Sequence, residues 1–174
     1  MWMTLKAGGF ALVATAGYMV GQTVASSYAR RPDDLKQCQA ALGLLSSEVE
    51  YATTHLGVAL QRVGRSLGGQ VGDAFCRAAA ALAGPANGTV EAWEEGLGWL
   101  QTATALSRAD IEILRTLGLR WGATDRADQL RHLAAAAERL KVQEDLAREA
   151  RNRNETVWRY LGALGGLALG LILL

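Results

Sequence analysis

The sequence predicts an all-α protein in which a bundle of six helices lies between two apolar terminal segments. Ala, Leu, Arg and Glu are abundant, whereas the 174 residues include only two Pro. This composition favours helices, because such side chains lose little freedom in them. No stretch shows the sustained alternation of apolar and polar residues that is typical of a half-buried strand. Almost all charged residues lie in the middle of the chain, between the apolar ends.

The first apolar segment covers residues 7–29 and contains no charged side chain. A helix crosses a bilayer with about 20 apolar residues, so we expect a transmembrane helix here, after a short outer segment at 1–6. A cleaved signal peptide is the alternative, because Lys6, the apolar run and the small residues after it imitate its three parts. Arg30 and Arg31 favour the anchor, since positive charge directly after the run resists export.

The second apolar segment, residues 157–174, is expected to form a second transmembrane helix. Arg159 lies near its start, where a long side chain can reach the headgroups. Basic residues near the inner ends of both segments outnumber Lys6, the one basic residue outside. Positive charge marks the cytoplasmic side. The middle domain, residues 30–156, is therefore expected in the cytoplasm, with both termini across the membrane.

Glycines recur at four-residue spacing in both apolar segments. Small residues at this spacing let the backbones of membrane helices approach closely. Glycine is also simply common in membrane helices, but three in register favour packing of the two segments with each other or with a partner. The residues concerned are Gly17 and Gly21 in the first segment, and Gly162, Gly166 and Gly170 in the second.

The first three helices of the middle domain are predicted at 32–52, 56–67 and 71–83. Pro32 suits the first turn of a helix, where its missing N–H costs nothing. The apolar residues that follow it recur at steps of three and four, which defines one buried face. The Gly-Gly pair at 68–69 is a typical end for the second helix.

The fourth and fifth helices follow a loop at 84–89, whose GPANGT sequence is rich in turn residues. Thr89 can cap the fourth helix. Ser107 and Asp110 resemble a capping pair for the fifth helix, and Gly118 is expected to end that helix in the left-handed conformation. The face of the fourth helix that is expected to be buried carries Ala92, Trp93, Leu97 and Leu100.

The sixth helix is predicted to be long. Asp125 can cap it, and neither Pro nor Gly follows before Gly162. Glu144 and Arg148 lie four residues apart in the order that stabilises a solvated helix. We therefore expect the last helix to continue without a break into the second apolar segment.

The sequence contains no catalytic or cofactor motif. It has neither a GxxxxGK[ST] phosphate-binding loop nor a GxSxG turn, and His55 and His132 lie in no metal-binding pattern. Cys38 and Cys76 are too far apart for a CxxC pair and are expected to be buried, reduced thiols. The net charge of +1 does not favour nucleic-acid binding. We expect a non-enzymatic protein without a cofactor, a metal or a small-molecule substrate.

A partner-binding surface is the remaining kind of site. Polar residues near the starts of the fourth and sixth helices are expected to be exposed, although a solvated helix face and simple helix capping would give the same pattern. The candidate residues are Glu91, Glu94, Glu95, Asp125, Gln129 and Arg131.

Residues spread along the whole chain resemble a known family in their order and spacing. They are Arg31-Pro32, Leu35, Leu42, Leu45, Glu48, Tyr51, Thr54 and Leu56, then Ala92-Trp93, Leu97, the LRTLG run at 114–118, Gly122, Asp125, Gln129, His132-Leu133 and Leu161-Gly162. With the two apolar ends, they resemble the stage III sporulation protein AB family of endospore-forming bacteria. At Ala52 and His55 the chain lacks the Gly and the Pro of the family's usual Tyr-Gly-x-Thr-Pro-Leu turn, so the turn after the first helix can differ.

The resemblance implies a helical bundle similar to one F domain of type II secretion and type IV pilus platform proteins. It implies a place in the mother-cell membrane around the forespore, as a platform component of the channel complex required for endospore formation. The implied partners are a cytoplasmic secretion-type ATPase, stage III sporulation protein AA, and the other membrane and ring proteins of the stage III sporulation channel. A two-span helical membrane receptor or signalling protein is the alternative function.

Overall fold

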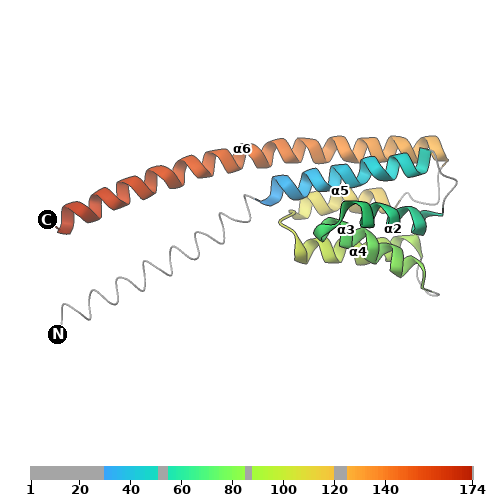
Figure 1. Cartoon of the computed structure of the whole chain (residues 1–174). Coiled ribbons are helices and arrows are strands. Elements are labelled where there is room, and N and C mark those ends of the chain that lie inside the picture. Colours follow the sequence, from blue (N-terminus) through green and yellow to red (C-terminus); the bar gives the residue numbers. More distant parts are fainter. Residues whose placement is uncertain (1–29, 51–54, 85–87, 120–124, 174) are drawn as a thin grey trace, which may run out of the picture. The chain divides into compact units, whose positions relative to one another are not determined.

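The computed structural model describes the backbone of residues 30–50, 55–84, 88–119 and 125–173, and side chains as far as Arg153 (Figure 1). Residues Arg30–Arg148 form one compact unit. Every regular element in the described ranges is a helix, and none of these residues forms a strand. The predicted all-α class is therefore confirmed.

Six helices make up the described chain. The first covers residues 30–50. The others are α2 at Leu56–Leu67, α3 at Gly69–Leu82, α4 at Thr89–Ala103, α5 at Arg108–Gly118 and α6 at Arg126–Leu173. α6 is a single helix of 48 residues, so the expectation of one long last helix is confirmed.

The predicted membrane segments are not tested by the structure. Across the residues that it describes, no helix combines the length and the apolar character that a bilayer crossing requires. The segment at 7–29, with Gly17 and Gly21, lies outside the described residues. So do the side chains of 157–174, which include Gly162, Gly166 and Gly170. Both spans and their glycine packing stay predictions.

The predicted starts and ends of the helices hold best where a local signal is strong. α2 has the predicted bounds. The first helix was predicted to begin at Pro32, but Arg30 and Arg31 are already helical, and its start lies outside the described residues. The turn after α2 uses Gly68 and Gly69, whose φ angles of 65° and 63° lie in the left-handed region that favours glycine. The turn after the first helix falls mostly in residues 51–54, outside the described ranges.

Two predicted helix ends are wrong. Thr89 does not cap α4: it is the first helical residue, and Gly88 holds the N-cap position without a side-chain hydrogen bond. Gly118 does end α5, but it is not left-handed, and the C-cap Leu119 has an ordinary φ of −62°. Close packing explains the glycine instead, because a Cβ on Gly118 would lie 2.0 Å from Cδ1 of Trp93.

Glycines also set the spacing of α2, α3 and α4. A Cβ on Gly64 of α2 would lie 2.6 Å from the carbonyl oxygen of Gly72 on α3, and one on Gly96 of α4 would lie 2.7 Å from the carbonyl oxygen of Ala74 on α3. Backbones at these two crossings are therefore in direct contact, which only a residue without a side chain allows. The three helices pack as a closely spaced group.

The core lies between this group, the first helix, α5 and α6. Phe75 of α3 meets Trp93 of α4 edge to face, with ring centroids 5.4 Å apart. The indole N–H of Trp93 donates to the carbonyl oxygen of Leu114 on α5 at 2.8 Å. The predicted buried face of α4 is confirmed, since Ala92, Trp93, Leu97 and Leu100 are all buried. The first helix contributes Leu35, Cys38, Ala41, Leu42 and Leu45, and α6 contributes Leu133, Ala136, Leu140 and Ala147.

Candidate functional site

The most developed polar site in the unit is a buried ion pair between Arg31 and Asp110. Nε and Nη2 of Arg31 donate to the two carboxylate oxygens of Asp110, each at 2.9 Å. The Asp110 side chain is 0% exposed and that of Arg31 is 23% exposed. Two parallel charge-assisted bonds give such a pair both strength and a fixed geometry.

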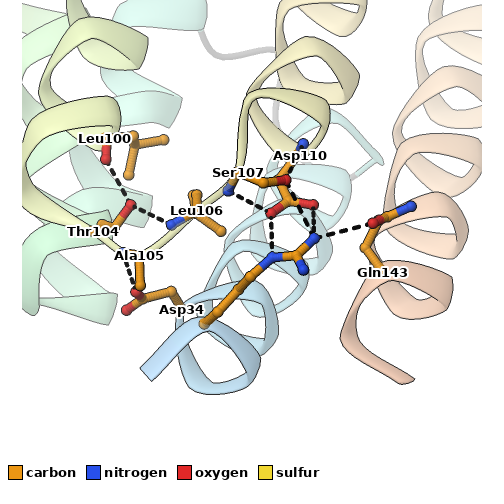
Figure 2. Close-up of polar contacts among 9 residues, drawn as sticks. Asp34, Leu100, Thr104, Ala105, Leu106, Ser107, Asp110 and Gln143 are labelled. Carbon is orange, nitrogen blue, oxygen red and sulfur yellow. Dashed lines mark hydrogen bonds and ion pairs between the residues drawn. The ribbon is translucent and has the colours of Figure 1, made fainter. Parts of the chain in front are cut away.

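The guanidinium of Arg31 also donates to two further side chains, Ser107 and Gln143, which Figure 2 labels near Asp110. Its Nη2 donates to Oγ of Ser107 at 3.2 Å and to Oε1 of Gln143 on α6 at 3.1 Å. One turn along the first helix, Asp34 accepts a hydrogen bond from the backbone N–H of Ala105 at 2.8 Å. One side chain thus joins the first helix, the start of α5 and α6.

The local sequence explains why Asp110 lies there. Ser107 is the N-cap of α5, its Oγ accepts from the N–H of Asp110, and Asp110 accepts from the N–H of Ser107 at 2.7 Å. This reciprocal capping box was expected from the sequence and is confirmed. The box alone leaves a carboxylate on the buried face of α5, beside Ile111 and Leu114. A buried carboxylate needs a counter-charge, and Arg31 supplies it.

Sequence reasoning did not find this role of Arg31. It used Arg31 as one of the basic residues that follow the first apolar segment and as part of the Arg31-Pro32 pair in the family resemblance, and it assigned Arg31 no partner. The missed signal is an acidic residue on an otherwise apolar helix face, because Asp110 precedes the buried Ile111, Leu114 and Leu117 at helical spacing. That signal calls for a cation but does not say which one.

Asp34, one turn from Arg31 on the first helix, has a carboxyl group with a raised pKa. Burial raises the pKa of its carboxyl group above the ordinary value, and the nearby charge of Asp33 raises it further. The N–H of Ala105 and the charge of Arg30 lower the same pKa, but burial is the largest cause. The network therefore holds one fully paired carboxylate, Asp110, and one partly buried carboxylate with a single backbone donor.

The network joins the beginning of the unit to a part of α6 near its end. Arg31 is the second residue of the unit, and Gln143 lies shortly before its last residue, Arg148. A second bond supports this junction, since Nε2 of Gln39 donates to Oε2 of Glu144 at 2.7 Å. The network fastens together the two places at which the terminal parts of the chain leave the unit.

The candidate partner residues lie elsewhere. Figure 1 shows the starts of α4 and α6 at one end of the unit and the start of α5 at the other. Glu91 and Glu95 are exposed, whereas Glu94 pairs with Arg115 of α5 at 2.7 Å. Arg115 donates hydrogen bonds to Glu94 and Glu112, and these bonds raise the pKa of its guanidinium above the ordinary value.

The candidates on α6 are mainly part of its first turns. Asp125 accepts from the backbone N–H of Asp128 at 2.8 Å, which confirms the predicted cap. Arg131 is exposed and pairs with Asp128, and Gln129 is half-buried. The structure thus gives Asp125 a helix-capping role, which was the alternative to partner binding, and it tests no partner for any of the six residues.

The remaining chemistry-bearing residues are the histidines, the cysteines and the acidic side chains. No group of three or more His, Cys, Asp or Glu among the described residues could hold a metal ion. Cys38 is buried, as expected, and burial raises the pKa of its thiol. Cys76 is half-buried, so the expectation of two buried thiols holds for the first only. A groove of about 530 Å³ between α2 and α3 is lined by His55, Leu56, Gly57, Val58, Gln61, Ala79, Ala80, Leu82 and Ala83.

Comparison with known proteins assigns the chain to a family. The family model of stage III sporulation protein AB matches residues 6–174. The chain is 31% identical over 170 residues to stage III sporulation protein AB of Bacillus subtilis (strain 168), covering 98% of this chain and 99% of that one. A solved structure of stage III sporulation protein AB matches with a TM-score of 0.66 at 28% identity, over 71% of this chain and 98% of the other. The chain therefore belongs to the stage III sporulation protein AB family, which supports a role in sporulation.

Proposed function

We propose that the protein is a non-enzymatic membrane platform component of the mother cell to forespore channel complex. The observation that carries the proposal is the Arg31 network, which fastens Asp110 and Gln143 to the first turn of the unit. The junction fixes the spacing of the two places in the unit, at Arg31 and Gln143, from which the chain leads on to the apolar terminal segments. The match of the family model supports it, because residues 6–174 include both segments.

The terminal segments act as membrane anchors in this proposal. Residues 7–29 and 157–174 span the mother-cell membrane around the forespore, and the unit between them lies in the cytoplasm. Gly17 and Gly21 pack against Gly162, Gly166 and Gly170, or against spans of other channel proteins, because small residues let such helices approach. In this proposal the helical bundle acts like one F domain of a secretion platform protein.

The end of the unit away from the Arg31 network is the proposed docking site for a cytoplasmic motor. Glu91, at the start of α4, and Arg131, near the start of α6, are exposed there. The proposed motor is the secretion-type ATPase stage III sporulation protein AA. Force applied at this end passes along α6, a continuous helix, toward the second terminal segment.

An in-frame deletion in the native host tests the proposal. We expect development to stop just after engulfment and heat-resistant spores to be lost, with rescue by the full chain but not by residues 30–156 alone. Arg31→Met should rescue poorly, whereas the matched control Arg108→Met, which changes an exposed residue near the same junction, should rescue fully. Normal spores from the deletion, or rescue by residues 30–156, would contradict a membrane-anchored platform.

Two further measurements separate the parts of the proposal. A topology reporter inserted in the loop at 84–88 should be active only in its cytoplasmic form, and an export-active reporter would favour the receptor alternative. Binding of the purified ATPase to the full chain should weaken in the double variant Glu91→Lys, Arg131→Glu. The matched control is Asp73→Lys, an exposed change on α3, and equal weakening by both variants would argue against a motor site at this end.

A further inference from the structure

α6 carries an exposed apolar stripe that no described element covers. Val142 and Leu146 are 52% and 53% exposed. With Ala135 and Arg139, both exposed, they follow a spacing of four, three and four residues. Such residues share one face of a helix. Among the described residues Arg139 has no ion-pair partner, so the stripe is apolar with a single free cation.

α4 carries a stripe of the opposite character. Glu91, Glu95, Gly98 and Thr102 are exposed and have the same spacing. A Cβ on Gly98 would meet nothing within 4 Å, so packing inside the chain gives no reason for a glycine that weakens the helix. Glu95 has no ion-pair partner in the described part of the chain. The stripe on α4 carries two carboxylates and has no side chain at Gly98, whereas the stripe on α6 carries a cation and large apolar side chains.

Both stripes border the same exposed side of α5. On one flank, Arg115 of α5 joins Glu94 of α4 and Glu112 at the surface. On the other flank, a groove of about 180 Å³ separates α5 from α6, and its walls include Thr116, Ala135 and Arg139. The surface therefore runs continuously from α4 over α5 to α6.

The two stripes also run in the same direction at the same height. α4 and α6 both begin at the end of the unit away from the Arg31 network and run toward it (Figure 1). Asp110 of α5 and Gln143 of α6 bind the same guanidinium. Asp110 and Gln143 therefore lie at the same height. α5 and α6 run in opposite directions, so moving three residues toward the Arg31 end of the unit leads from Asp110 back to Ser107 and from Gln143 on to Leu146. Ser107 and Leu146 are thus also level. Since α4 ends just before Ser107, Thr102 and Leu146 lie at the same height to within about one turn.

We propose that this α4–α5–α6 surface binds a second copy of the same chain in parallel orientation. A twofold axis along the helices brings α4 of each copy onto α6 of the other. Arg139 then faces Glu95 of the second copy, and Val142 faces the hollow at Gly98. A twofold interface must be self-complementary, and here each stripe supplies the charge and the shape that the other lacks.

Charge complementarity selects a second copy over an unrelated partner. A partner that binds the α6 stripe needs a carboxylate opposite Arg139 and a small residue opposite Val142. Glu95 and Gly98 provide both, and they are three residues apart, as Arg139 and Val142 are. In the parallel orientation the first residue of the unit, Arg30, and its last residue, Arg148, lie at the same end of the dimer in both copies, which is compatible with anchoring in one membrane. The inference goes beyond the proposed function and does not depend on it.

A charge-swap experiment tests the contact directly. Two differently tagged full-length chains are co-expressed and extracted in mild detergent, and their co-purification is measured. We expect Glu95→Arg paired with itself, and Arg139→Glu paired with itself, to lose co-purification at least about tenfold. Mixing Glu95→Arg with Arg139→Glu should restore it, because each contact then joins opposite charges again. Both positions are exposed, so equal melting temperatures of all variants would show that folding is unchanged.

Cysteine crosslinking fixes the geometry. In a Cys76→Ser background, co-expressed Gly98→Cys and Val142→Cys chains should form a disulfide-linked dimer under mild oxidation. The control is Ser47→Cys, an exposed position on the first helix, which should not link to Val142→Cys. Absence of co-purification of unmodified chains, or mixed charge variants that associate no better than each alone, would overturn the proposal. Crosslinked species larger than a dimer from chains that carry both cysteines would overturn the twofold arrangement.

Discussion

The guanidinium of Arg31 holds both carboxylate oxygens of Asp110 at 2.9 Å, although the two residues lie 79 positions apart in the chain. The carboxylate is fully buried and already belongs to the capping box of α5. Removing the cation would leave a buried charge without a partner, which costs far more than the loss of a surface pair. The first turn of the unit is thus tied to α5 by a buried, bidentate ion pair.

Arg31→Met should therefore destabilise the unit by about 3–5 kcal/mol. The methionine keeps much of the apolar stem but cannot neutralise Asp110. Urea unfolding of the full chain in detergent, followed by circular dichroism, measures the change. In the double variant Arg31→Met, Asp110→Asn the loss should be clearly smaller than the sum of the two single losses, because no buried charge remains; strict additivity would show that the two residues act independently.

Gly118→Ala and Gly43→Ala should have opposite effects on stability. The new Cβ at position 118 would lie 2.0 Å from Cδ1 of Trp93, whose N–H is fixed by the carbonyl oxygen of Leu114. Overpacking of this kind costs about 1–3 kcal/mol. At Gly43, in the middle of the first helix, a Cβ would meet nothing within 4 Å, so alanine should stabilise by about 0.5–1 kcal/mol. Thermal unfolding of both variants checks the pair, and equal effects would contradict a packing role for Gly118.

Asp34→Asn should stabilise the unit at neutral pH but not in acid. Burial raises the pKa of Asp34 in the folded state. Protonation of Asp34 therefore adds to the free energy of unfolding at pH values below the unfolded-state pKa. This contribution is lost as the pH rises through the raised folded-state pKa. At pH 7 the buried charge is a cost, which Asn removes while its amide oxygen can still accept from the N–H of Ala105.

The gain from Asp34→Asn should shrink as the pH falls, because Asp34 itself becomes neutral there. Unfolding midpoints of both proteins from pH 3 to pH 8 measure this dependence. Asp34→Ala is the matched control: it removes the charge and also the acceptor for Ala105, so it should be less stable than Asp34→Asn at every pH. A gain that grows in acid would show that the carboxylate is stabilised, not penalised, by its surroundings.

Local signals in the sequence predicted most of the fold. α2 has the predicted bounds because a Gly-Gly pair follows it, and the capping box of Ser107 and Asp110 and the cap at Asp125 depend only on neighbouring residues. Thr89 failed as a cap because the preceding Gly88 adopts the extended N-cap conformation itself. Signals that a few adjacent residues determine are readable from one sequence.

The candidate site was harder to predict because it depends on contacts between distant elements. Nothing near Arg31 in the chain indicates Asp110 or Gln143, and nothing near Gly118 indicates the indole of Trp93. The charged residues chosen as a partner surface were treated as free, but Glu94 has Arg115 on the neighbouring helix. Pairing across helices depends on packing, which a single sequence does not specify.

Cys38 and Cys76 should differ sharply in their reactivity toward thiol reagents. The thiolate is the reactive form, and burial raises the pKa of the Cys38 thiol, with the charges of Asp34 and Asp110 adding to the effect. Cys76 is only half-buried. Labelling of the native full chain with iodoacetamide, followed by mass spectrometry of the peptides, should modify Cys76 first and leave Cys38 unmodified until the unit unfolds.

Arg31→Met links this labelling to the ion-pair network. Cys38 lies one turn beyond Asp34 on the first helix, so loosening of that helix should expose its thiol. We expect labelling of Cys38 to accelerate in Arg31→Met, whereas the rate in the exposed control Arg108→Met should match the unmodified chain. If Cys38 reacts as fast as Cys76 in the native chain, the first helix is not held as the structure describes. If Arg31→Met leaves its rate unchanged, the ion pair does not hold that helix in place.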